Sequence, residues 1–289
     1  PPPPPPPPPP LFFFKQIRAY AMLRSLVGSE MCIRDRENNI NVKTFNGSLL
    51  WEPWEILKDD NTPYKVFSPF YRKGCLVKHN GPRGIVNSEN VTFCKKLDSS
   101  GDIDSLNLLP NHEWKDKFEN YWNIGEKAAM TKYIHFRDNG LTGYKEGRNF
   151  PSKPFVSRIS PHIHFGELSP NQAWHLAKLK GNNRNIDHFL SELGWREFSY
   201  SQLYFNPDLP KKNLQSKFDQ FPWEENSHNL KAWQQGQTGV PMVDAGMREL
   251  WLTGSMHNRV RMVVGSFLVK NLLLNWQHGE RWFWECLVD

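Results

Sequence analysis

The chain has 289 residues, of which 38% are hydrophobic and 23% charged, enough for one large domain or two smaller ones. No stretch approaches about 18 uninterrupted apolar residues, which excludes a membrane-spanning protein. The four cysteines (Cys32, Cys75, Cys94 and Cys286) show no CxxC spacing, so we expect neither a metal site nor a disulfide framework. A reducing, cytoplasmic compartment is the resulting expectation.

Residues 1–36 differ in character from the rest of the chain. Residues 1–10 are all proline, and the run LRSLVGSEMCIRDR at 23–36 resembles translated sequencing-adaptor DNA. We therefore interpret residues 1–36 as an artefact that is not part of the fold. Two biological interpretations compete with it: a polyproline II stalk of the kind that SH3 domains bind, and a basic amphipathic organelle-targeting peptide.

The charge balance depends on that segment. It holds five Lys or Arg and two acids, so residues 37–289 carry a net charge of +3 instead of the +6 of the whole chain. Such a mild basic balance does not by itself indicate nucleic-acid binding. All 12 tryptophans lie after position 50, and that density calls for an explanation.

The pattern of residues changes along the chain. Residues 40–50 partly alternate and contain Asn46-Gly47, which predicts a short strand and a turn. Residues 81–120 are polar and broken by glycine and proline, as in a linker or long surface loop. From about residue 122 the periodicity is helical, and Ser169-Pro170 predicts a helix start. Further helices are expected over 185–205, 229–236, 241–253, 256–274 and 280–288. Residues 37–80 would then be the remnant of an α/β domain, and 121–289 a larger helical domain.

One predicted helix carries an unusual polar stripe. Glu192, Trp195 and Arg196 stand at i, i+3 and i+4 within 185–205, so they share a face. A carboxylate, a large aromatic ring and a guanidinium on one face are unusual for a core.

A second helix, over 256–274, carries another such stripe. It comprises Asn258, Arg261, Met262 and Gly265, and the glycine would allow close approach. Two such faces suggest a deep pocket for a large, flat, polar ligand. An interhelical seam of salt bridges is the alternative, and periodicity does not decide between the two.

The segment FVSRISPHIHFGELSP at 155–170 could hold a phosphate. Ser157, Arg158 and Ser160 supply hydroxyls, backbone amides and a cation just before a helix start. Neither GxGxxG nor GxxxxGK[ST] is present, so a Rossmann fingerprint and a P-loop are excluded.

Four motifs in order, SRISPHIHFGELSP, ELGWREFSY, KAWQQGQTGVPMVDAGMREL and MHNRVRMVVGSFLVKNLLLNW, resemble the FAD-binding domain of the photolyase/cryptochrome family. FNGSLLWEP and YKVFSPFYRKGCL resemble the stretch that leads out of the family's N-terminal domain. The resemblance covers about 40–80 and 120–289, and within the family the chain looks most like bacterial class I cyclobutane pyrimidine dimer photolyases. It implies a mainly α fold: a helical FAD-binding domain preceded by the tail of an α/β antenna domain.

By this resemblance the cofactor is FAD. The residues implied to line it are Tyr144, Ser157, Arg158, Ile159, Ser160, Phe189, Arg196, Arg261 and Asp289. Arg261 would pair with Asp289 beside the flavin. A second, antenna chromophore (folate or deazaflavin) would belong to the α/β domain, which is mostly absent from this sequence.

The resemblance also implies roles toward damaged DNA. Glu192 and Asn258 would be the catalytic residues, facing both flavin and lesion. The lesion- and DNA-binding set is Arg148, Glu192, Trp195, Asn258, Arg259 and Met262. Within it Trp195 would stack on the extruded bases, and Arg148 would contact a DNA phosphate. Trp223 and Trp276 stand at the family's positions for electron transfer to the flavin.

The implied activity is light-dependent repair of cyclobutane pyrimidine dimers by a deoxyribodipyrimidine photo-lyase, with electron transfer from excited reduced FAD. The expected partner is UV-damaged DNA, bound by a monomer without a membrane. A cryptochrome-type blue-light receptor is the alternative, but such receptors tend to carry other residues at Trp195 and Met262. A 6-4 photolyase is a third option, which usually has His-His where this chain has His257-Asn258.

The chain departs from the family pattern in two places. Val156 replaces a threonine that usually precedes the Ser-Arg pair, so one hydroxyl is lost. The sequence also stops at Asp289, before further residues that the family places around flavin and lesion. We therefore expect a C-terminally incomplete FAD-binding domain that binds FAD weakly.

Overall fold

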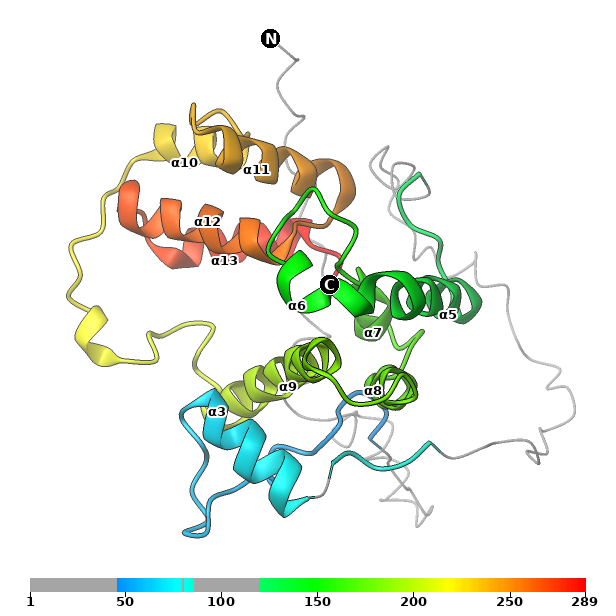
Figure 1. The fold of residues 1–289 in the computed structure, drawn as a ribbon. Helices are drawn as coiled ribbons and strands as arrows, with labels where there is room; N and C mark the ends of the chain where they lie inside the picture. Colours follow the sequence, from blue (N-terminus) through cyan, green and yellow to red (C-terminus); the bar gives the residue numbers. More distant parts are fainter. Residues whose placement is uncertain (1–45, 80, 86–119) are drawn as a thin grey trace, which may run out of the picture.

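Helices form the architecture of the parts that the structure, a computed structural model, describes: residues 46–79, 81–85 and 120–289 (Figure 1). Within these ranges there is no β-strand, only an isolated antiparallel bridge between Leu57 and Pro63. The principal helices are α3 (Phe67–Pro69) with its π-helical continuation η2 (Phe70–Lys78), α5 (Glu126–His135), α6 (Tyr144–Gly147), α7 (Ser160–His164), α8 (Pro170–Lys178), α9 (Arg184–Phe205), α10 (Ser227–Gln234), α11 (Pro241–Thr253), α12 (Asn258–Ser266) and α13 (Trp276–Cys286). Shorter helical turns are η4 (Phe136–Gly140), η5 (Leu141–Gly143), η6 (Ser216–Phe218) and η7 (Phe267–Asn271). The prediction of a mainly helical fold is confirmed.

Local sequence signals account for several helix boundaries. At the start of α8 the Ser169 hydroxyl accepts the backbone N–H of Gln172, and the Gln172 side chain accepts the N–H of Ser169. This capping box, with Pro170 at the first position, is the start predicted from Ser169-Pro170. The predicted helices at 185–205, 229–236 and 241–253 correspond to α9, α10 and α11.

Other predicted elements need correction. Residues 46–50 form no strand, because the Asn46 side chain accepts the backbone N–H groups of Ser48 and Leu49 and turns the chain; residues 40–45 lie outside the described ranges. The helix predicted over 256–274 begins at Asn258 and passes into the π-helical η7, which ends at Asn271. The helix predicted over 280–288 starts earlier, as α13.

The N-terminal part also differs from expectation. The described residues of the predicted α/β remnant contain α3 and η2 and no strand. These two helices were not predicted from the sequence. Most of the predicted linker at 81–120 lies outside the described residues.

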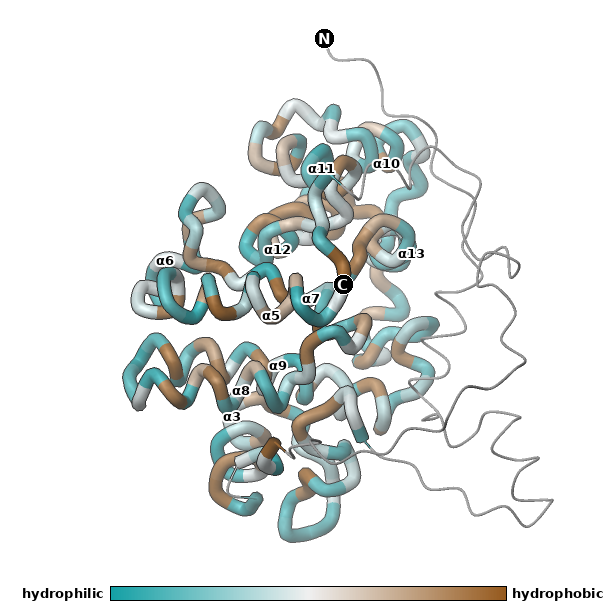
Figure 2. The backbone as a smooth tube through the Cα atoms, turned by 90° about the vertical axis from the view of Figure 1, so that its right-hand side faces the viewer, coloured by the Kyte–Doolittle hydropathy of each residue, from teal (hydrophilic) through white to brown (hydrophobic). Residues whose placement is uncertain are grey.

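The buried hydrophobic residues of the described ranges form two cores. The first core contains residues from 50 to 193 and joins η2, α5, α8 and the first half of α9; the second joins α10 to α13. In Figure 1 the four helices α10–α13 form one group, with α8, α9 and α3 in another and α5–α7 between them. Figure 2 shows hydrophobic and hydrophilic residues alternating along these helices, as expected of helices with one buried side. The arrangement leaves room for a site between the two cores.

Helix α9 contacts residues 46–79, called the N-terminal segment below, directly. The buried Glu197 carboxylate accepts the backbone N–H groups of Leu50 (2.9 Å) and Trp51 (3.4 Å) and an N–H of Arg196 (2.9 Å). Burial outweighs these hydrogen bonds and raises the pKa of Glu197 to about 7.

A glycine permits a second contact between α9 and the N-terminal segment. A Cβ on Gly194 would lie 2.4 Å from the ring of Tyr71, so only glycine lets η2 pack this closely on α9.

No helix in the described ranges combines the length and apolar character needed to cross a bilayer.

Candidate functional site: a cavity between the two cores

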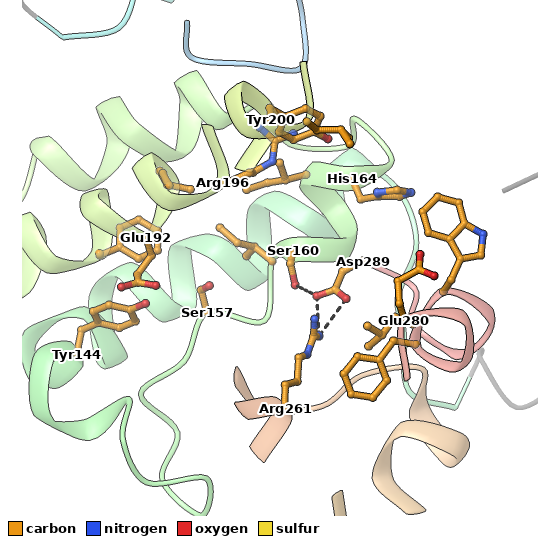
Figure 3. Close-up of a pocket in the computed structure, with 18 residues that line it drawn as sticks. Tyr144, Ser157, Ser160, His164, Glu192, Arg196, Tyr200, Arg261, Glu280 and Asp289 are labelled. Carbon is orange, nitrogen blue, oxygen red and sulfur yellow. Dashed lines mark hydrogen bonds and ion pairs between the residues drawn. The ribbon is translucent and has the colours of Figure 1, made fainter. Parts of the chain in front are cut away.

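A cavity of about 810 Å³ opens between the two cores (Figure 3). Its walls come from the loop before α7, from α9, from α12 and α13, and from the end of the chain. The lining residues are Tyr144, Ser157, Ile159, Ser160, Ile163, His164, Phe189, Glu192, Leu193, Arg196, Tyr200, Leu203, Arg261, Glu280, Phe283, Trp284, Leu287 and Asp289. Apolar side chains and convergent polar or charged groups contribute about equally to the lining, as a large ligand with both flat apolar and polar parts requires.

A hydrogen-bonded ion pair closes one side of the cavity. The Arg261 guanidinium donates to both carboxylate oxygens of Asp289, at 3.0 and 2.8 Å, and Ser160 Oγ donates to the same carboxylate at 2.6 Å. Arg261 also donates from Nε to the carbonyl of Met256 at 2.8 Å. These bonds join the start of α7, helix α12 and the last residue of the chain, and they contain the pair that the resemblance implies (Figure 3).

The loop before α7 contributes unequally to the cavity. Ser157, Ile159 and Ser160 line it. Arg158 does not: its backbone is left-handed (φ 50°), its side chain is exposed, and it approaches Glu249 of α11 at 3.6 Å. The prediction that Arg158 lines the cofactor is therefore not supported by its position.

The carboxylate of Glu192 faces the cavity from α9 and is paired with a buried guanidinium. Arg148 forms an ion pair with it, and His188, one turn earlier on α9, stands 3.9 Å from the same oxygen. The Arg148 side chain is only 7% exposed and is bound to Glu192. It is therefore not presented to a DNA phosphate as predicted. Burial and the nearby Arg148 lower the pKa of His188, which favours its neutral form.

Aromatic rings form the wall beside Glu192. Tyr144 and Phe189 meet edge to face with centroids 5.5 Å apart, and burial raises the pKa of Tyr144 to about 12. Farther along α9, the guanidinium of Arg196 lies over the ring of Tyr200, 4.8 Å from its centroid, while an N–H bonds Glu197. Arg196 is thereby held at the cavity wall.

The predicted lesion-binding residues other than Glu192 do not line the cavity. Trp195 is 45% exposed and Met262 is 56% exposed, next in sequence to the lining residues Arg196 and Arg261. Asn258, at the start of α12, is also exposed, so its predicted position facing the flavin is not seen.

Arg259 is held on the surface beside this region. Its Nε donates to Asn149 Oδ1 at 2.9 Å, and its Nη1 lies 3.4 Å from the sulfur of Met262. It therefore stands with Met262 outside the cavity.

The two tryptophans predicted to transfer electrons also lie outside the lining. Trp223 packs against Phe221 with centroids 4.4 Å apart, and the following residue, Glu224, donates its N–H to the carbonyl of Leu273. The indole N–H of Trp276 donates to Asn213 Oδ1 at 2.7 Å. Both side chains are half-buried.

Several lining residues were not predicted from the sequence. The most informative are Glu280, Phe283 and Trp284 of α13, which stand at i, i+3 and i+4 and so share a face. That spacing is visible in the sequence and could have placed them. His164 and Tyr200 complete the polar lining, and burial raises the pKa of Glu280.

The cavity has the chemistry that a dinucleotide flavin requires. Its volume falls in the range of cofactor pockets, the Ser157 and Ser160 hydroxyls and Arg196 can meet a diphosphate or ribityl chain, and Phe189 offers an apolar face. In the described residues no group of three or more His, Cys, Asp or Glu could hold a metal.

Comparison with known proteins identifies the family. The family model "FAD binding domain of DNA photolyase" matches residues 189–289, and the family model "DNA photolyase" matches residues 29–83, which begins within the segment 1–36 that the sequence predicts to be an artefact. The chain is 41% identical over 259 residues to a deoxyribodipyrimidine photo-lyase of Agrobacterium fabrum, covering 88% of this chain and 54% of that protein. The chain belongs to the photolyase/cryptochrome family.

Both branches of the photolyase/cryptochrome family are represented among its relatives. Cryptochrome-1 of Arabidopsis thaliana is 34% identical over 269 residues, 86% of this chain and 38% of that protein. A crystal structure of a bacterial class III photolyase from Agrobacterium tumefaciens superposes with a TM-score of 0.82 at 39% identity, covering 91% of this chain and 55% of that one. This match does not support the class I assignment expected from the sequence. The chain spans about half the length of the photo-lyases it matches.

Proposed function

We propose that the chain is the flavin-binding part of a deoxyribodipyrimidine photo-lyase that repairs cyclobutane pyrimidine dimers in DNA. The observation that carries the proposal is the pair of exposed, apolar side chains beside the cavity, Trp195 and Met262. Large exposed apolar groups next to a cavity commonly mark a contact surface, and an extruded pyrimidine pair offers flat apolar faces to cover them.

The cavity residues have distinct tasks in this proposal. Ser157 and Ser160 would hold the diphosphate and ribityl region of FAD, and the Arg261–Asp289 pair would stand beside the isoalloxazine. Reduced FAD, when bound and excited by light, supplies the electron that opens the cyclobutane ring. After the ring has opened, the electron returns to the flavin. The protein's part is to bind, orient and exclude water.

Glu192 would hydrogen-bond the lesion in this proposal. Its carboxylate lies at the cavity wall beside Arg148, and its oxygens can accept N–H groups of the pyrimidines. Trp195, three residues along the same helix, would stack on the flipped bases. Around them, phosphate contacts would make DNA binding dependent on salt concentration and largely independent of base sequence.

The alternative is a blue-light receptor that binds FAD without repairing DNA. The sequence identity of 34% to two plant cryptochromes supports this alternative. A 6-4 photolyase is the third candidate, and His257-Asn258 argues against it. Location in the cytoplasm, a monomeric state and an antenna chromophore stay predictions.

Light-dependent repair separates these candidates. The full-length gene product, reduced beforehand, would be mixed with an oligonucleotide that carries one thymine dimer, and recovery of thymine absorbance followed under blue light. We expect recovery in light and none in the dark. A flavoprotein that leaves the dimer intact contradicts repair of this lesion, and a parallel oligonucleotide with a 6-4 product tests the third candidate.

A single variant tests the lesion contact. Trp195→Ala should weaken binding to the dimer-containing oligonucleotide by about tenfold, because base–aromatic stacking contributes roughly 1–3 kcal/mol, while the flavin content stays unchanged. Unaltered affinity for damaged DNA would refute the assignment of Trp195.

A further inference from the structure

Three aromatic rings form a stack that ends in Trp195. Phe67, at the start of α3, lies on the indole of Trp195 with ring centroids 3.8 Å apart and planes 12° from parallel. Tyr71 lies against Phe67, with centroids 5.5 Å apart and planes at 10°. Phe67 and Tyr71 belong to the N-terminal segment, whereas Trp195 belongs to α9.

The base of this stack is fixed. Tyr71 is buried, and its ring rests on the backbone of α9 at Gly194, where a Cβ would lie 2.4 Å away. Phe198, one turn after Gly194, packs its ring against the edges of both Phe67 (6.0 Å, 70°) and Trp195 (5.8 Å, 79°). Stacked and edge-to-face contacts together fix the plane of the indole.

The stack explains how a tryptophan can be both ordered and exposed. Phe67 covers one face of the Trp195 indole, and the side chain is still 45% exposed. An unsupported tryptophan would lose freedom about two side-chain bonds on binding, whereas this one is already held.

We propose that Phe67 is a positioning residue for damaged DNA: it holds the indole of Trp195 so that the uncovered face meets the extruded base. The inference rests on the proposed function, since it requires Trp195 to contact the lesion. It assigns to the N-terminal segment a part in lesion recognition that is exerted through α9.

The test is a double-mutant cycle in the full-length gene product. The variants are Phe67→Leu, Phe67→Tyr, Trp195→Ala and the double variant Phe67→Leu/Trp195→Ala. The measured quantity is the ratio of dissociation constants for an undamaged oligonucleotide and for the same oligonucleotide with one thymine dimer. Flavin content and the urea unfolding midpoint are measured for each variant.

We expect Phe67→Leu to lower this ratio by about 3- to 10-fold, because the indole must then be ordered during binding. Phe67→Tyr keeps a ring in place and should retain the ratio of the wild type. The double variant should be no worse than Trp195→Ala alone. Tyr64→Leu is a matched control: it removes a half-buried ring of the same segment that packs on Phe70, and it should leave the ratio unchanged.

The outcomes separate the two proposals. A normal ratio in Phe67→Leu together with a reduced ratio in Trp195→Ala overturns the positioning role alone. A further loss from Phe67→Leu in the absence of Trp195 also overturns it, because the effect then does not pass through the indole. A normal ratio in Trp195→Ala overturns the lesion contact itself, and the positioning role with it.

Discussion

The buried carboxylate of Glu197 gives a quantitative test of how α9 holds the N-terminal segment. Its oxygens accept N–H groups from Leu50, Trp51 and Arg196, and the side chain is almost wholly buried. Desolvation outweighs these bonds and raises its pKa from 4.5 to about 7. Glu197→Gln keeps the shape and removes the titration.

The sign of the pH effect follows from proton binding. Between pH 4.5 and 7 the folded protein holds a proton on Glu197 that the unfolded chain has released, so the stability contributed by this group falls as pH rises through the window. A gap of about 2.5 pH units corresponds to about 3 kcal/mol in the free energy of unfolding. The contribution is fully present below pH 4.5 and lost above about pH 7.

Urea unfolding of wild type and Glu197→Gln at pH 5 and pH 8 measures this directly. All other groups titrate in both proteins, so the difference between their free energies of unfolding isolates Glu197. Because the unfolded group is already mostly ionised at pH 5, we expect that difference to change by about 2–3 kcal/mol between the two pH values, with the wild type relatively less stable at pH 8. A difference independent of pH would refute the raised pKa and the burial argument behind it.

Three further substitutions follow from the geometry. Gly194→Ala should lower the free energy of unfolding by roughly 1–3 kcal/mol in urea titrations, because the new Cβ overlaps Tyr71; unchanged stability would contradict this packing. Arg261→Met should weaken FAD binding roughly tenfold in fluorescence titrations by leaving Asp289 without its partner, and undiminished affinity would remove the pair from the cofactor site. Trp223→Phe should slow photoreduction of oxidised flavin while sparing repair by pre-reduced protein; photoreduction at the wild-type rate would exclude Trp223 from the electron path.

Elements with local signals were predictable from the sequence. The hydroxyl and proline at Ser169-Pro170 specify the start of α8 through bonds within one turn, and the long apolar periodicity of α9 fixes its extent. The helical α3 and η2 were missed, because a proline at position 69 and a glycine at position 74 weaken the helical pattern and tertiary packing on α9 compensates.

The site was predictable only where a motif or one helix face contains it. Glu192 and Arg196 share a face one turn apart, and both line the cavity. The partner of Glu192, Arg148, lies 44 positions earlier in the chain, and periodicity within one helix carries no information on such a contact. Phe67 reaches Trp195 across a still longer separation, for the same reason without a signal.

Helix α9 links the two halves of the molecule because it carries two functional stripes. One stripe, with Glu192 and Arg196, lines the cavity. The other runs at i, i+3 and i+4 through Gly194, Glu197 and Phe198 and meets the N-terminal segment. A single helix is stiff over this length, so a displacement of the second stripe moves the first. The residues that anchor the N-terminal segment should therefore affect cavity geometry as well as stability.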